Sequence, residues 1–115
     1  MPSAIAKLRA IKVMHTVAWA FFASAILVVP VAAWLESWTT AFYAIAIVTV
    51  ECLILFFNRM RCPLTDVAAR YTENRADNFD IYLPLWLARH NKLIFGTLFL
   101  VSVLFVLVRR FAAQA

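Results

Sequence analysis

Five polar side chains that could move a proton or bind a ligand are scattered through an otherwise apolar sequence: His15, Glu51, Asn58, Cys62 and His90. On a helix, positions 51, 58 and 62 recur on one face, so three of them are predicted to form a polar stripe. A carboxylate beside an imidazole can transfer a proton, two imidazoles can ligate a haem, and a thiol can act as a nucleophile. Which chemistry is open depends on the elements that carry these residues.

Those elements are predicted to be membrane-spanning helices. The chain has 115 residues, of which 65% are hydrophobic and only 15% are charged. A bilayer of about 30 Å is crossed by about 20 helical residues. Residues 13–35 carry no charge, residues 37–58 carry only Glu51, and residues 93–108 form a shorter run that Lys92 and Arg109 extend by snorkelling. We expect helices at about 13–35, 37–61 and 92–110, joined by a loop at about 62–91.

The loop is predicted to contain one or two short interfacial helices. Pro63 is expected to end or kink the second helix, and Thr65 is a good N-cap for a short helix that runs to about Tyr71. The apolar and basic residues before Lys92 favour a helix starting near Pro84, either lying in the headgroups or leading directly into the third span. The fold class is therefore an all-α membrane protein with a single integral domain over 1–115.

Basic residues predict the orientation. Nine of them precede the first span or lie between the second and third, which places the N-terminus and the loop in the cytoplasm and the C-terminus outside. Trp34 and Trp38 fall at the outer ends of the first two spans, where indole rings are favoured. The basic residues flank hydrophobic spans without a nucleic-acid-binding module, so the expected partner is the bilayer and not nucleic acid. The expected contacts to lipid headgroups are Arg59, Arg61, Arg89 and Lys92.

The polar residues are predicted to meet at the cytoplasmic leaflet. An ionised Glu51 inside the membrane costs on the order of 2.5–3.5 kcal/mol, so it must be neutral, paired or hydrated. His15 enters the membrane about 4 Å beyond Lys12 and is its expected partner. The candidate binding cluster comprises His15, Glu51, Asn58, Cys62, Thr65 and His90.

One segment also carries a resemblance. "RCPLTDVAARY", with a carboxylate in the preceding span and the histidine of "IKVMHTVAWAFF", resembles a group of small uncharacterised bacterial inner-membrane proteins. They share a Cys-Pro-Leu-Thr motif directly after a transmembrane helix. The motif positions here are His15, Glu51 and 62–65, and the match covers about half of the chain. The resemblance implies a bacterial inner-membrane location and no particular activity.

Two cofactor or thiol chemistries remain open from the sequence. His15 and His90 are the only histidines and both lie at the inner ends of spans, which suits bis-imidazole ligation of a b-type haem in an electron-transfer anchor. Against this, His15 could simply bond Glu51 or a backbone carbonyl. Cys62 lies beside Arg61, yet a structural thiol at a helix bend is the favoured interpretation. Ten residues of helix separate it from Cys52, too far for a disulfide, and no metal-ligand spacing is present.

Two functions of a different class complete the alternatives. The cluster could serve a component that binds or transports a small ligand, a lipid headgroup or protons, which with three spans requires an oligomer. The favoured function is a small accessory subunit or homo-oligomer, in which small residues such as Ala20 and Ser24, or Thr40 and Ala44, pack against another helix. No enzyme motif or catalytic residue is visible. The loop acids Asp66, Glu73, Asp77 and Asp80 are expected to form a solvated surface with the bases around them.

Overall fold

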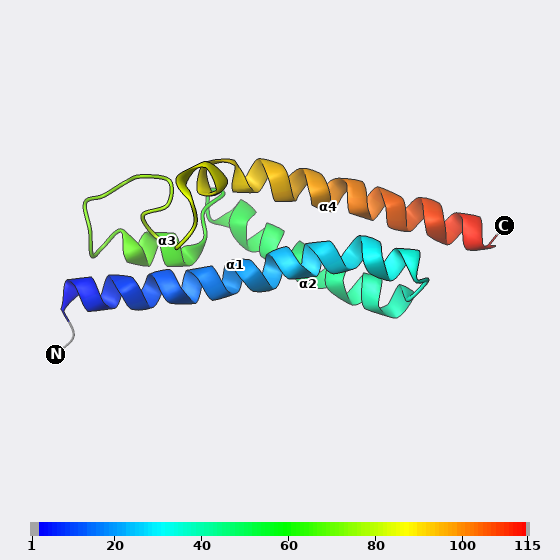
Figure 1. Ribbon diagram of the computed structural model, residues 1–115, viewed down its shortest axis with the longest axis horizontal. Coiled ribbons are helices and arrows are strands. Elements are labelled where there is room, and N and C mark those ends of the chain that lie inside the picture. The colour runs from blue at the N-terminus through cyan, green and yellow to red at the C-terminus, as the bar shows by residue number, and fades with distance from the viewer. Residues whose placement is uncertain (1–2, 115) are drawn as a thin grey trace. The chain divides into compact units, whose positions relative to one another are not determined.

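The computed structural model describes residues 3–114, and the regular structure within them is entirely helical (Figure 1). Three long helices are each apolar and long enough to cross a membrane, as the hydrophobic runs predict. A short fourth helix lies in the connection between the second and third of these. The elements are α1 (Ala4–Trp34), α2 (Trp38–Phe57), α3 (Pro63–Ala68) and α4 (Leu85–Gln114).

The helices α1 and α4 begin earlier in the sequence than the hydrophobic runs predict. α1 begins at Ala4, so the basic residues before the first apolar run are already helical. α4 begins at Leu85, directly after Pro84, and continues without a break into the third apolar run. Of the two arrangements considered for this segment, the one that leads directly into the span is therefore the one observed. Proline suits this boundary because its ring blocks a further helical turn before it.

α1 and α2 end in the same backbone motif. After α1, Glu36 has a φ of 58°, and the Ser37 amide donates to the Ala32 carbonyl at 2.8 Å. After α2, Arg59 has a φ of 58°, and the Met60 amide donates to the Leu55 carbonyl at 2.6 Å. This is the Schellman pattern, in which glycine usually occupies the left-handed position. The expectation that Pro63 ends the second helix is wrong, because the chain has already turned at Arg59.

α3 starts at Pro63, with Cys62 and not Thr65 as its N-cap residue. Cys62 has extended backbone angles, and Pro63 occupies the first helical position, where its missing N–H costs nothing. The N-cap side chain makes no capping hydrogen bond. Thr65 lies inside the helix, so the prediction that it caps a helix reaching about Tyr71 is wrong in both bounds. Its hydroxyl is used for another contact, described below.

The chain divides into two compact units, each built from separate stretches of sequence. Unit 1 comprises Met1–Ala20 and Leu53–Asn91, and unit 2 comprises Phe21–Cys52 and Lys92–Ala115. Unit 1 therefore holds the first half of α1, the end of α2, α3, the loop and the start of α4. Unit 2 holds the remaining parts of the three long helices.

Small residues form the core of unit 2. Ala33 and Ala41 have no exposed surface, and Val106 from α4 is 1% exposed. Small side chains allow helix backbones to approach closely, which is the usual basis of packing between apolar helices. Ala44 belongs to this core, so its small face serves packing within the chain. The buried cluster consists of Val29, Ala32, Ala33, Ala41, Ala44 and Val106.

Arg109 of α4 caps the end of α1 inside unit 2. Its guanidinium donates from Nε to the Ala33 carbonyl at 3.2 Å and from a terminal nitrogen to the Trp34 carbonyl at 3.0 Å. The same group lies 4.9 Å from the centre of the Trp34 ring and 3.7 Å from a Glu36 oxygen. These contacts satisfy carbonyls that the end of a helix leaves without an intrahelical partner.

Candidate functional site

The strongest candidate site is a polar cluster in unit 1 built around His15 and Asp80. His15 lies on α1, and its Nδ1 is 3.0 Å from the Asp80 carbonyl oxygen and 3.4 Å from Asp80 Oδ2. The two side chains are 16% and 7% exposed, so the pair is largely shielded from water. A carbonyl oxygen can only accept a hydrogen bond, so Nδ1 of His15 carries a proton and donates it to Asp80.

α3 supplies two further members of the cluster. The Thr65 hydroxyl donates to Asp80 Oδ2. Cys62, the N-cap residue of α3, lies close enough to His15 for the two side chains to interact. Pro63 sets the start of α3 between Cys62 and Thr65, which fixes a thiol at the N-cap and a hydroxyl one turn later. We call these four residues, Cys62, His15, Asp80 and Thr65, the imidazole cluster.

The electrostatics of Asp80 fit a carboxylate that stays ionised. Burial by itself favours the neutral acid, but hydrogen bonds from His15 and Thr65 and the charge of His15 outweigh it and lower the pKa of Asp80 below its ordinary value. A buried acid is tolerated only when its oxygens are paired in this way. Asp80 therefore acts as a fixed negative charge against the imidazole.

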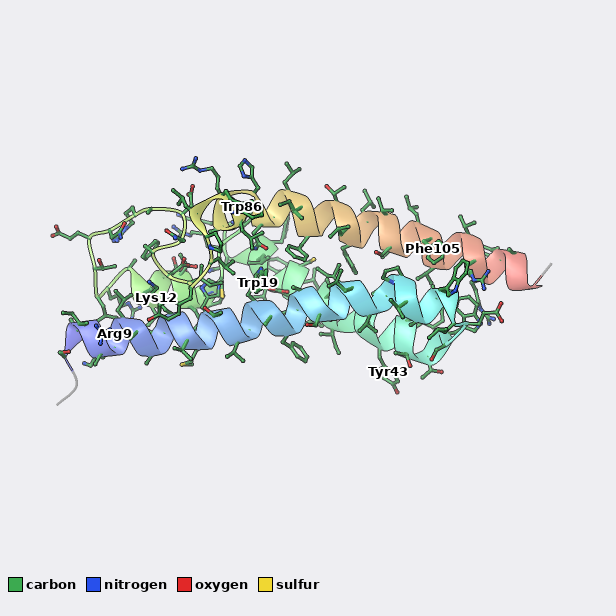
Figure 2. All side chains as sticks on the ribbon, viewed as in Figure 1. Arg9, Lys12, Trp19, Tyr43, Trp86 and Phe105 are labelled. Atoms are coloured by element: carbon green, nitrogen blue, oxygen red, sulfur yellow. The ribbon has the colours of Figure 1, made fainter. Side chains whose placement is uncertain are left out.

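Further contacts fasten the same loop to α1. The Tyr82 amide donates to Thr16 Oγ1 at 2.9 Å, and the Lys12 ammonium lies 4.4 Å from the centre of the Tyr82 ring. The Trp19 indole donates to Asn91 Oδ1 at 2.7 Å. Lys12 and Trp19 can be located on α1 in Figure 2. Successive turns of α1 thus hold the loop and the start of α4, so the cluster rests on a built scaffold.

A second polar group joins the end of α2 to α3. Asn58 Nδ2 donates to the Arg61 carbonyl at 2.7 Å and to Asp66 Oδ2 at 3.0 Å. An Arg61 guanidinium nitrogen lies 3.4 Å from Asp66 Oδ1. The side chains of Arg61 and Asp66 are 51% and 39% exposed, so this pair adds little stability and mainly orients the turn before Cys62.

Only part of the predicted cluster comes together in the structure. The structure brings His15, Cys62 and Thr65 together, but the carboxylate that it places against His15 is Asp80. Glu51 belongs to unit 2. The predicted helical stripe from Glu51 to Cys62 is wrong, because α2 ends at Phe57 and the chain then turns through two left-handed residues.

The remaining predicted residues lie on the surface of their elements. His90 is exposed, and its Nδ1 bonds the Trp86 carbonyl of its own helix at 2.9 Å. Arg89 is paired with Asp77 at 2.8 Å, an exposed contact. Arg59, Arg61 and Lys92 are also exposed, as headgroup contacts require. Across residues 3–114, the structure shows no group of three or more His, Cys, Asp or Glu side chains able to hold a metal ion.

Asp80 is the residue that sequence reasoning missed. It was expected on a solvated surface, and this is wrong, since the residue is 5% exposed. The prediction considered only the balance of acidic and basic residues in the loop, so it treated all four acids as exposed to solvent. The local sequence held a better signal: Asp80 lies between Phe79 and Ile81, and Ile81 is also 5% exposed. An acid flanked by large apolar residues is a candidate for burial with a partner.

Comparisons with known proteins add no assignment. No family model, curated protein or solved structure matches this chain. The chemistry of the site therefore has to be inferred from its geometry. That geometry offers a thiol and a buried imidazole that a carboxylate holds in place.

Proposed function

We propose that the chain is a three-span bacterial inner-membrane protein that works as a homo-oligomer or as an accessory subunit of another membrane protein. The supporting observation is how little of the spans the chain covers by itself. Within a continuous apolar stretch of 18 residues in each long helix, 33% of the residues are buried in α1, 17% in α2 and 11% in α4. Lipid and neighbouring helices must cover the rest, because this much apolar surface is not stable in water.

The charge distribution supports an orientation with the N-terminus and the loop between α2 and α4 in the cytoplasm. Unit 1 contains eight of the 11 basic residues, and unit 2 contains Lys92, Arg109 and Arg110. Basic residues near the ends of spans are retained on the cytoplasmic side. With this orientation the N-terminus and the imidazole cluster lie inside, and the C-terminus lies outside.

Small residues on open helix faces favour a helical partner over lipid alone. Ala20 and Ser24 are one turn apart on α1, and both are exposed. Gly96, the only glycine, faces open space on α4: a Cβ added there meets no atom within 4 Å. The fold itself does not need these positions to be small, whereas close approach of a second helix does.

Native mass spectrometry of the protein released from nanodiscs tests the association. The wild type should be found as an oligomer or with a co-purified membrane protein. Ser24→Leu and Gly96→Leu should shift it to the monomer by at least tenfold, because the added side chains hold a partner backbone away. Val101→Leu, at an exposed apolar position on α4, is the matched control and should not. A wild type that is monomeric at every concentration contradicts the proposal.

Thiol labelling tests the orientation independently. A membrane-impermeant maleimide should reach Cys62 in inverted membrane vesicles and not in intact spheroplasts, in a background carrying Cys52→Ser. Labelling from the outside would reverse the proposed orientation while leaving the association result intact.

A further inference from the structure

The basic side chains of unit 1 fall into two groups, according to whether the fold already occupies them. Arg61 lies 3.4 Å from an Asp66 oxygen. Arg89 lies 2.8 Å from an Asp77 oxygen, and Arg75 donates to backbone carbonyls of the loop. Within residues 3–114, the other five basic residues of unit 1 have neither a carboxylate at ion-pair distance nor a carbonyl bonded to their side chains: Lys7, Arg9, Lys12, Arg59 and Arg70.

Three of these five cations lie on the first turns of α1, at the depth of the lipid headgroups. α1 has 31 residues and is therefore about 46 Å long, whereas the hydrocarbon layer is about 30 Å thick. The charge-free part of α1 starts at Val13 and is about 33 Å long, so the turns before it lie outside the hydrocarbon. Lys12, Arg9 and Lys7 precede Val13 by about 1.5, 6 and 9 Å along the helix axis. The headgroup layer on each side is about 5–8 Å thick, which matches these positions.

Two of the three cations are held in place by aromatic rings and not by acids. The Lys7 ammonium lies 5.6 Å from the centre of the Tyr71 ring. The Lys12 ammonium lies 4.4 Å from the centre of the Tyr82 ring, and the Tyr82 amide is bonded to Thr16 of α1. A ring covers only one side of an ammonium group, so N–H donors remain for an anion. The positions of both lysines are thus set without their charge being neutralised.

The third cation, Arg9, lies on the face of α1 that the loop leaves open. The covered face includes Ile11, which is 8% exposed, and His15, which contacts the loop. Arg9, Val13 and Val17 follow one another at intervals of four residues, so they share the other face. Arg9 is exposed, and Val13 and Val17 are 52% and 64% exposed. Arg9 and Lys12 can both be located on these turns in Figure 2.

We propose that Lys7, Arg9 and Lys12 form a binding site for an anionic phospholipid. The lipid phosphate lies against the first turns of α1, and an acyl chain continues along the face that carries Val13 and Val17. A headgroup with a net negative charge complements these cations, whereas a zwitterionic headgroup brings an ammonium group of its own. The site rests on the proposed function only in requiring these turns to lie at a membrane surface, and it is the same for either orientation.

This site differs from the headgroup contacts expected from the sequence. Arg61 and Arg89 belonged to that expectation, but each already has a carboxylate partner in unit 1. An arginine paired in this way must give up its partner before it binds a phosphate. The unoccupied cations of α1 bind without that cost, so equal changes in net charge should have unequal effects at the two places.

The first test is native mass spectrometry of the protein released from nanodiscs that contain equal amounts of phosphatidylglycerol and phosphatidylcholine with the same acyl chains. The wild type should retain phosphatidylglycerol at least tenfold more often than phosphatidylcholine. Equal retention of the two lipids overturns the proposal.

Charge-matched variants then distinguish a site from the general attraction of a basic protein to anionic lipid. The double variant Arg9→Gln/Lys12→Gln should lower the preference for phosphatidylglycerol at least fivefold. Arg61→Gln/Arg89→Gln removes the same net charge and should leave the preference within twofold of the wild type. Equal losses in the two double variants overturn the site, because they show that only net charge matters.

A single substitution guards against loss of folding. Within residues 3–114, the Arg9 side chain has no hydrogen bond, ion pair or ring contact, so Arg9→Gln removes no contact that holds unit 1. This variant should lower the preference at least twofold, whereas Arg9→Lys should retain it. An unchanged preference in Arg9→Gln overturns the role of Arg9.

The last arm separates a lipid from a free phosphate group. Excess inorganic phosphate, at constant ionic strength, should not displace the retained phosphatidylglycerol, and displacement overturns the lipid as the ligand. A chain that enters nanodiscs without preferring phosphatidylglycerol overturns this proposal and leaves the proposed function intact. A chain that does not enter nanodiscs contradicts both.

Discussion

Different interactions stabilise the interior of each of the two units, although the three long helices each contribute residues to both. Unit 1 is fastened by specific polar contacts between residues far apart in sequence, such as His15 and Asp80, which are 65 positions apart. Unit 2 is packed through alanine and valine side chains, with Arg109 at one end. In this chain, polar contacts position the loop against α1. The helix segments of unit 2 pack mainly through the close fit of small apolar side chains.

The contrast also separates chemistry from packing. Every member of the imidazole cluster belongs to unit 1, and each interacts with another member there. Among the residues that the structure describes, Ser102, which is 6% exposed, is the one buried polar residue of unit 2. Substitutions that remove polar contacts should therefore destabilise unit 1 selectively. Substitutions that enlarge buried small side chains should destabilise unit 2.

The largest effect is expected from Asp80→Ala. Removing the carboxylate leaves the Thr65 hydroxyl without its buried acceptor and the His15 ring without its ion-pair partner, which should lower the free energy of unfolding by about 3 kcal/mol. Unfolding in mixed micelles, followed by circular dichroism, measures the change. Asp77→Ala is the matched control: it breaks an exposed ion pair and should cost less than about 1 kcal/mol. If the two substitutions lowered the free energy of unfolding equally, the buried contacts of Asp80 would contribute no more stability than an exposed ion pair.

In unit 2, the substitution Ala33→Leu should be the most destabilising of those considered. Ala33 has no exposed surface, so the longer side chain must push α1 away from its neighbours, at a cost of about 2 kcal/mol. Ala46→Leu, at an exposed position on α2, adds the same atoms and should cost almost nothing. The same unfolding experiment compares the two. A tolerated Ala33→Leu would mean that the small-residue core is not closely packed.

Acidification should weaken unit 1 through Asp80. Its pKa is lowered in the folded chain, so its contribution to stability is complete above the unfolded value of about 3.9 and is lost as pH falls through the folded value. The difference in melting temperature between wild type and Asp80→Asn should be constant from pH 7 to 5 and shrink below about pH 4. A difference that grows on acidification would reverse the sign of this linkage.

The smallest expected effect is a gain from Glu36→Gly. Relief of the left-handed backbone at this position is worth about 1 kcal/mol. The lost ion pair with Arg109, at 3.7 Å and half exposed, is worth at most about 0.5 kcal/mol. The melting temperature should therefore rise slightly, whereas Glu36→Gln keeps the backbone cost, loses the charge and should not stabilise.

Hydrophobic runs were enough to predict the three long helices, and Pro84 was enough to place the start of α4. The early histidine and the Cys-Pro-Leu-Thr segment were also predicted to meet. What could not be predicted was which carboxylate His15 would find. Helical periodicity favoured Glu51, but it assumed that α2 continues to Cys62, and no glycine or proline marks the left-handed turn at Arg59. Asp80 is brought to His15 by the path of the loop, a long-range property that local patterns do not encode.

The most direct test of the division into two units is hydrogen–deuterium exchange of Asp80→Asn against Asp77→Asn in nanodiscs. Asp80→Asn keeps the shape of the side chain and removes the charge that holds His15. We expect Asp80→Asn to exchange faster in α3 and in the loop up to Pro84, with the α1, α2 and α4 segments of unit 2 unchanged. Asp77→Asn should have no such effect. Exchange that rises equally in both units, or in neither, would contradict it.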